Sequence, residues 1–404
     1  MTKEEGGSSM KQGRSSMMAN SMKLISAGTF VQVLAFLLLP VIGRIYTESE
    51  IGQITVFLSV VGVLTIVATG RYDQATILAR SKERALLLLF TALRFNLIFC
   101  LALIPAGVIS LLSWANSHNQ YGRMSIAQIS QGLGNNLLRI GFGLLKMGFW
   151  GLQLAALLGG MAGIFPLVRK QALLSQYKRY VTRRRLRIAA RTYANFPRYS
   201  LPQAVIDILS GSLVSLLLPL QYHDAAIGLY GMAYMLAGRP MQLISDSLSR
   251  VWFRRVAEQK NTRQSFLLPI RRFVFIWLLV AVLGSILIFF FLEPLVVVIL
   301  GKKWLLCSSI IMAMLPFFIF NFLSSVYNFL PDLFGKQQKF MRMQAILLIV
   351  QLLVILIGTR LLPFEKYMWL HFAERALDSL VQIAWFYMII RKYENSLRLH
   401  SCAS

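Results

Sequence analysis

Four ionisable residues near the C-terminus have types and spacings that could do chemistry. Glu374 and Arg375 lie three and four residues after His371, and Asp378 lies four and three residues after them, which places the four residues on one stripe of a helix. Asp378 falls near the middle of an apolar stretch. His and carboxylate side chains inside a membrane can relay protons, whereas the alternative is a salt-bridge cluster that locks the helix to its neighbour. The stripe is therefore predicted to couple ions or to be structural.

Arginine is the second residue type of interest, because its planar guanidinium can bind phosphate oxygens at two points. Charged residues inside apolar stretches are costly and usually face a water-filled cavity. Arg239 is followed by Pro240, which removes a backbone hydrogen bond and kinks the helix near mid-membrane. Arg239 is thus the strongest phosphate-binding candidate. The further substrate-binding candidates are Arg139, Arg94 and Arg44.

The remaining charged residues of note are predicted to be structural. Arg71 and Asp73 follow the second apolar stretch and are expected to form an ion pair at a helix end. Asp207 is expected to pair with a neighbouring cation, in a structural or ion-coupling role. The four His and three Cys show no metal-ligand spacing, so no metal site and no cofactor are predicted.

The composition is that of an all-α polytopic membrane protein. Hydrophobic residues make up 56% and charged residues 14%, where soluble domains have about 25% charge. The net charge of +26 lies in short loops between apolar stretches, which favours membrane topology and contact with anionic phospholipids over nucleic acid. Eleven stretches are long enough to cross a membrane: about 24–43, 51–70, 85–113, 126–145, 149–168, 203–221, 226–250, 273–292, 306–330, 343–360 and 367–390.

The segment 169–198 divides these stretches into two halves. It holds ten Lys and Arg and no Asp or Glu, so it is predicted to be a cytoplasmic loop, part of which lies as an amphipathic helix on anionic headgroups. The polar leader and the C-terminal tail are also predicted to be cytoplasmic. Three crossings between residue 85 and this loop would place its positive charges outside, so the stretch 85–113 conflicts with the expected topology.

Five motifs together resemble the polysaccharide biosynthesis proteins, the Wzx-type oligosaccharide flippases of the MOP superfamily. The motifs occur in the family's order and cover nearly the whole chain from residue 22. They are Pro40-Val-Ile-Gly-Arg44-Ile-Tyr46 with Ile51-Gly52, Thr69-Gly70-Arg71-Tyr72-Asp73, Phe196-Pro197-Arg198-Tyr199-Ser200-Leu201-Pro202, Gly228-Leu229-Tyr230 with Arg239-Pro240, and Gly301-Lys302-Lys303-Trp304. Through these motifs the resemblance marks Arg71, Asp73, Pro197, Pro240 and Trp304 as structural positions.

The resemblance implies two pseudo-symmetric helical bundles and a non-enzymatic activity. The expected function is to flip polyprenyl-diphosphate-linked oligosaccharide across the bacterial cytoplasmic (inner) membrane by alternating access, for O-antigen, capsule or exopolysaccharide assembly. Partners would be this lipid-linked oligosaccharide, anionic phospholipids and the polysaccharide polymerase machinery. The family has at least twelve helices, so one helix would be missing near residues 108–113. Open alternatives are another MOP-superfamily exporter of a lipid precursor or drug, and an inactive paralogue.

The predicted domains follow from the loops and the resemblance. Residues 1–21 form a polar, disordered leader, 22–168 an N-terminal bundle of about five helices, and 169–200 the basic cytoplasmic loop. Residues 201–392 form a C-terminal six-helix bundle, and 393–404 a cytoplasmic tail. A membrane enzyme such as a polymerase or glycosyltransferase would need a large extramembrane active site. The longest loop has no carboxylate to serve as a base or metal ligand.

Overall fold

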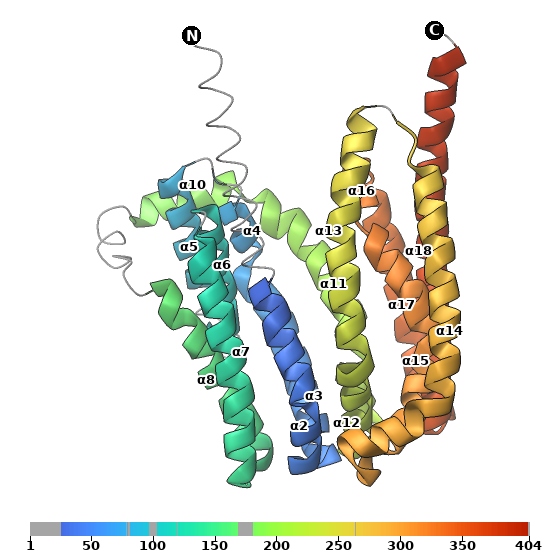
Figure 1. Cartoon of the computed structure of the whole chain (residues 1–404). Coiled ribbons are helices and arrows are strands. Elements are labelled where there is room, and N and C mark those ends of the chain that lie inside the picture. The colour runs from blue at the N-terminus through green and yellow to red at the C-terminus, as the bar shows by residue number, and fades with distance from the viewer. Residues whose placement is uncertain are drawn as a thin grey trace, which may run out of the picture. The chain divides into compact units, whose positions relative to one another are not determined.

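The computed structural model describes residues 26–402 with the exceptions of 78, 80, 97–102, 119, 169–180 and 263. Every regular element in this part of the chain is a helix, which confirms the predicted all-α class (Figure 1). The chain divides into two compact units. Unit 1 takes Met1–Tyr46 and Val56–Leu209, and unit 2 takes Thr47–Thr55 and Ser210–Ser404.

Six helices among the described residues are long and apolar enough to cross a membrane, or seven if a bent pair counts as one span. The bent pair is Ser26–Leu37 followed by α2 (Leu39–Ile45), with an angle of 42° between them. Pro40 lies in the first turn of α2, where its missing N–H costs nothing. These helices confirm the polytopic membrane fold.

Unit 1 is built around the antiparallel pair α7 and α8, which make the most extensive contact of any two helices. Glycines allow this approach, because a Cβ on Gly159 would lie 2.8 Å from Asn135 and one on Gly163 would lie 3.0 Å from Gln131. The helices of the unit are α3 (Glu48–Thr69), α4 (Tyr72–Ile77), α5 (Lys82–Asn96), α6 (Leu103–Ser117), α7 (Tyr121–Leu144), α8 (Gly148–Val168), α10 (Arg183–Thr192), the π-turn η2 (Phe196–Ser200) and α11 (Leu201–Leu217). Helices α3 and α11 continue into unit 2.

The stretch 85–113 is two helices, so the prediction of one continuous segment is wrong. The start of α5 and the end of α6 pack in one cluster with Met124 of α7 and Leu167 of α8. At their other ends, the amide of Asn96 lies 2.7 Å from the carbonyl oxygen of Ala68, and Ala106 packs against Ala68. Helices α5 and α6 therefore form an antiparallel hairpin, in which the start of α5 lies beside the end of α6.

The hairpin bears on the predicted topology. Its described helical segments, α5 and α6, have 15 residues each, and residues 97–102 between them lie outside the described part of the chain. A chain that enters and leaves at one end of a hairpin makes no net crossing there, so the hairpin would remove the conflict with the expected topology. The sequence predicts one segment and a missing helix in this region, whereas the structure has the two helices α5 and α6.

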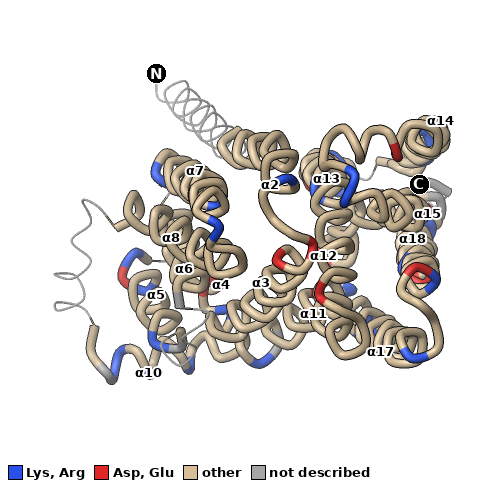
Figure 2. Tube along the Cα trace, turned by 90° about the horizontal axis from the view of Figure 1, so that it is seen from below, with Lys and Arg blue, Asp and Glu red and all other residues tan. Residues whose placement is uncertain are grey.

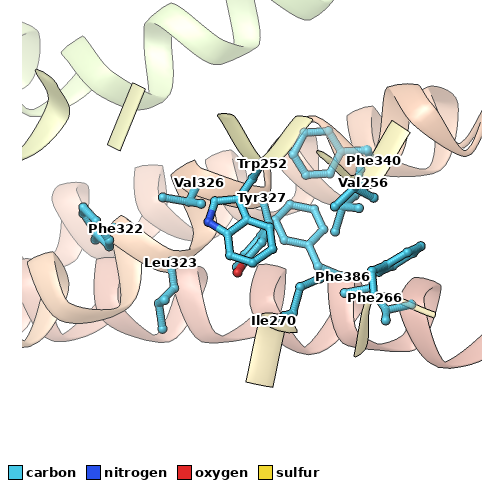
Figure 3. Packing of buried hydrophobic residues seen from close by; sticks show 12 residues of the cluster. Trp252, Val256, Phe266, Ile270, Phe322, Leu323, Val326, Tyr327, Phe340 and Phe386 are labelled. Carbon is cyan, nitrogen blue, oxygen red and sulfur yellow. The ribbon is translucent and has the colours of Figure 1, made fainter. Parts of the chain in front are cut away.

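Unit 2 is built around the contact between α15 and α18. Its elements after α11 are η3 (Leu218–Leu220), α12 (Asp224–Ala233), the π-turn η4 (Tyr234–Gly238), α13 (Arg239–Asn261), α14 (Leu267–Leu300), η5 (Lys302–Trp304), α15 (Leu306–Tyr327), α16 (Leu330–Leu333), α17 (Gln337–Leu361) and α18 (Phe364–Cys402). A buried cluster, here called the aromatic cluster, joins α13, α14, α15, α17 and α18 (Figure 3). It includes Trp252, Phe266, Phe322, Tyr327, Phe340 and Phe386.

A buried carboxylate ties the last helix to α14 beside this cluster. Glu394 of α18 accepts hydrogen bonds from the Ser265 hydroxyl at 3.0 Å and from the backbone N–H groups of Phe266 and Leu267 at 3.1 and 3.3 Å. The first N–H groups of a helix have no partner within the helix, and an anion there is favoured by the helix dipole. Glu394 thus caps α14 from the neighbouring helix.

The hairpin predicts a labelling pattern. In a chain whose three cysteines are changed to serine, Ser81→Cys and Ser117→Cys should react with a membrane-impermeant maleimide from the same side of the membrane. Lys146→Cys, in the turn between α7 and α8, should react from the opposite side. Labelling of positions 81 and 117 from opposite sides would show that this region crosses once.

Removal of the cap should destabilise unit 2. Glu394→Ala leaves two backbone donors and one hydroxyl without their acceptor, at a cost of about 1–3 kcal/mol. We expect a lower thermal unfolding midpoint in detergent. The matched control is Glu365→Ala, which removes an exposed carboxylate from the same helix and should leave the midpoint unchanged. Equal midpoints for the two variants would contradict the capping role.

Candidate functional site

The predicted stripe on α18 is a buried ionisable cluster inside unit 2. The Arg375 guanidinium donates a hydrogen bond to Asp378 with Nη1 and Oδ2 3.0 Å apart, and His371 Nδ1 lies 3.7 Å from Glu374 Oε2. His371, Glu374 and Asp378 are buried, with exposed fractions of 2%, 7% and 4%. The helical spacing read from the sequence therefore brings all four residues together.

The two carboxyl groups of the cluster interact with one another. Glu374 and Asp378 share a side-chain hydrogen bond, and Arg375 is the cation that acts on both. Apart from this contact, the Glu374 oxygens and the Nδ1 atom of His371 have no hydrogen-bond partner among the described residues. Two carboxyl groups thus face one guanidinium in a site of low dielectric, where an uncompensated charge is costly.

Arg239 and Arg375 of the α18 cluster both act electrostatically on Tyr234. Tyr234 begins the π-turn η4, and Arg239 begins α13 directly after it, with Pro240 in the first turn. A π-turn inserts one residue into the helical repeat, so residues five apart come onto nearly the same face. The turn is what brings Arg239 toward Tyr234.

Aromatic rings line the space around the two arginines. The Arg375 guanidinium lies 5.8 Å from the centre of the Phe317 ring, within the range of a cation–π contact. Tyr230 stacks on Tyr234 and on Phe372, with ring centres 6.3 Å apart in each pair. Neither Tyr234 nor Phe317 is predicted from the sequence as a site residue. The four-residue spacing between Tyr230 and Tyr234 is a sequence feature that could have pointed to Tyr234, and no comparable feature marks Phe317.

The three candidate arginines of unit 1 do not come together in one site. Arg139 is buried in α7, and its backbone carbonyl accepts a 2.6 Å hydrogen bond from the Tyr46 hydroxyl. Arg44 is exposed in the last turn of α2, two residues before Tyr46. Arg94 is exposed in the last turn of α5. The structure brings Arg44 and Arg139 into one region of unit 1 but not Arg94.

The expected ion pair between Arg71 and Asp73 is not formed. Asp73 is buried, and its Oδ1 atom has no hydrogen-bond partner, nor has the Arg71 Nε atom. Arg71 adopts a left-handed backbone with φ 58°, next to Gly70 at φ 55°. This turn links α3 to α4 and directs the two side chains differently, which helical spacing alone could not show.

The remaining predicted positions lie in three separate elements. Pro197 lies in the π-turn η2, and Asp207 is exposed on α11. Trp304 is fully buried in η5, beside Gly301 with φ 99°, a conformation that favours glycine.

Within unit 2 a Cβ on Gly52 would collide with the carbonyl of Asp224, and one on Gly228 with that of Glu48. The motifs at residues 51–52 and 228–230 therefore pack directly together.

The charge balance of the α18 cluster predicts a pattern of stabilities. Arg375→Ala should lower the thermal unfolding midpoint strongly, because it leaves two buried carboxyl groups without a cation, at about 3 kcal/mol. Adding Asp378→Asn should restore most of the loss. Arg360→Ala, at the exposed end of α17, is the matched control and should have little effect. A wild-type midpoint for Arg375→Ala would contradict this account.

Comparisons with known proteins agree with the fold. The family model described as "Polysaccharide biosynthesis protein" matches residues 91–309, more than half of the chain. No curated protein matches the chain. Among solved structures, the inward-facing form of a multidrug resistance MATE family transporter of the MOP superfamily is 13% identical, with a TM-score of 0.64, and covers 92% of this chain and 99% of its own.

Two further solved structures are similar. The lipid II flippase MurJ in an inward closed conformation is 14% identical with a TM-score of 0.59, covering 94% of this chain and 93% of its own. A MOP superfamily transporter from Pyrococcus furiosus, described as having a binding pocket of reverse polarity, is 13% identical with a TM-score of 0.50, covering 94% and 96%. With the family match, these likenesses show that the chain belongs to the polysaccharide biosynthesis protein family and has the transporter fold of the MOP superfamily.

Proposed function

We propose that the protein flips polyprenyl-diphosphate-linked oligosaccharide across the bacterial cytoplasmic membrane by alternating access, for O-antigen, capsule or exopolysaccharide assembly. Family membership supports a flippase or exporter that acts in polysaccharide biosynthesis. The observation that carries the substrate class is that Arg239 and Arg375 of unit 2 both act electrostatically on Tyr234. Two guanidinium groups in one region suit a diphosphate, because each can donate two parallel hydrogen bonds to phosphate oxygens.

The site suits an anion better than a cationic drug. Arg239 stands at the exposed start of α13, and Arg375 is still 19% exposed despite its bond to Asp378. The surrounding rings of Tyr234 and Phe317 provide an apolar wall that strengthens electrostatic contacts by excluding water. An exporter of a drug or of another lipid precursor remains the second candidate, supported by the likeness to a multidrug MATE transporter. An inactive paralogue is the third.

Arg139, Arg94 and Arg44 stay candidates for contact with the glycan or the phosphate along the transport path.

Within unit 1 the proposed role of the basic loop is contact with anionic phospholipids. Helix α10 is held by buried Leu186 and Ala189 and by a hydrogen bond from the Tyr72 hydroxyl to Ala190. Four of its arginines are exposed: Arg184, Arg185, Arg187 and Arg191. Figure 2 shows basic residues along α10 in blue. The C-terminus of the chain is also proposed to lie in the cytoplasm.

Complementation tests the flippase. A bacterium that lacks its own oligosaccharide flippase should regain surface glycan when it expresses this chain, in at least one of several glycan backgrounds. Arg239→Ala should abolish that surface glycan, because the diphosphate loses one of its two cations, whereas Arg239→Lys should retain part of the activity. Membrane levels of each variant are measured by blot.

The matched control is Arg360→Ala, which removes a similar charge from the exposed end of α17 and should leave surface glycan at the wild-type level. Wild-type transport by Arg239→Ala at equal membrane level would reject the phosphate-binding role. Good insertion without surface glycan in any background would favour another exported substrate or an inactive paralogue.

A further inference from the structure

Arg375 stands between two sets of partners. On one side it donates a 3.0 Å hydrogen bond to Asp378, whose side chain is 6% exposed. On the other side it acts electrostatically on Tyr230 and Tyr234, and Tyr234 in turn interacts with Arg239. Arg375 is itself 19% exposed, so it is more accessible than the carboxylate that it binds. A phosphate that engaged Arg239 would therefore also come under the influence of Arg375, since both arginines act on Tyr234.

The other charged and titratable groups around the carboxyl pair Glu374–Asp378 are few. Helix α18 supplies His371 and Tyr367, and Tyr230 and Tyr234 face it from α12 and η4. Helix α15 contains no Asp, Glu, Lys, Arg or His, and the charged residues of α17 lie at its ends: Lys339, Arg342 and Arg360. Arg375 is therefore the cation on which both carboxyl groups depend.

We propose that a bound diphosphate and Asp378 compete for Arg375, so that the carboxyl pair Glu374–Asp378 takes up a proton when the diphosphate binds. The inference rests on the proposed function, because it assumes that a diphosphate binds at Arg239 and Arg375. When the guanidinium turns to the phosphate, the pair loses its only strong neutralising partner. In a buried site of low dielectric, a proton shared by the pair replaces that charge at lower cost than an isolated carboxylate.

His371 offers the proton a path into the pair. Its Nδ1 atom lies 3.7 Å from Glu374 Oε2 and has no hydrogen-bond partner, and the Tyr367 ring stacks on it with centres 6.0 Å apart. In the opposite direction along α18, Gln382 accepts a 2.5 Å hydrogen bond from Ser324, and Phe386 belongs to the aromatic cluster. The polar side chains that follow Asp378 along α18 therefore end at the packed rings of the aromatic cluster.

Thermodynamic linkage makes the coupling reciprocal. If the diphosphate promotes proton uptake, the proton promotes diphosphate binding by the same free energy. Affinity should therefore fall as pH rises through the range where the proton is taken up, by up to about tenfold per pH unit for one proton. The lipid-linked anion and the proton would then occupy unit 2 together.

The test measures binding and proton uptake together on the full chain in detergent. Farnesyl diphosphate is titrated into weakly buffered protein above about pH 8, where its phosphates are ionised, with farnesol as the uncharged control ligand. Calorimetry in two buffers of different ionisation enthalpy gives the number of protons taken up. We expect uptake approaching one proton per farnesyl diphosphate in the wild type, and none with Asp378→Asn.

Asp378→Asn should bind farnesyl diphosphate at least as tightly as the wild type, and with an affinity that no longer falls with pH, because no carboxylate then competes for Arg375. Glu365→Gln removes an exposed carboxylate of the same helix and should keep the wild-type uptake. All variants bind the same ligand, so any protonation of the ligand itself cancels. Thermal unfolding and gel filtration confirm that each variant is folded.

The outcomes separate the two proposals. Binding of farnesyl diphosphate with equal proton uptake in the wild type and Asp378→Asn, or with none in either, overturns the competition for Arg375 and leaves the proposed diphosphate site standing. No binding by folded wild-type protein, while complementation succeeds, overturns the diphosphate site at Arg239 and with it this inference. Uptake that is lost only with Asp378→Asn supports both.

Discussion

A charged side chain that is kept from water must be neutralised, hydrogen-bonded or given a route to solvent, and the centre of unit 2 depends on this constraint. Arg375 is the one cation acting on both Glu374 and Asp378, and it also reaches Tyr234. Helix α15, which packs along α18, brings no charge of its own to this region. The electrostatic state of the core therefore depends on where a single guanidinium points.

The proposed function would give this guanidinium two tasks. It lies beside buried carboxyl groups that need a cation, and its side chain is still 19% exposed, so a ligand could reach it. In the proposal, Arg375 would alternate between Asp378 and the phosphate, and a ligand that favours one of two conformations shifts the equilibrium between them.

Backbone irregularities decide which residues meet. The π-turns η2 and η4 both occur just before or at a proline-containing helix start, and η4 places Arg239 near Tyr234. The glycine contact between residues 52 and 228 makes the first turns of α3 part of unit 2. In unit 1 the chain reverses between α5 and α6, so the start of α5 and the end of α6 both pack against α7 and α8.

The sequence by itself determined the helical class, the apolar spans and the stripe from His371 to Asp378, because these depend on local hydrophobicity and on a regular helical period. It also pointed to Arg239 through the neighbouring proline. Only the tertiary structure decided that 85–113 folds back on itself, that Arg71 and Asp73 do not pair, and that Tyr234 and Phe317 line the site. Those outcomes depend on a chain reversal, a left-handed turn, a π-turn and contacts between distant helices, none of which a regular period encodes.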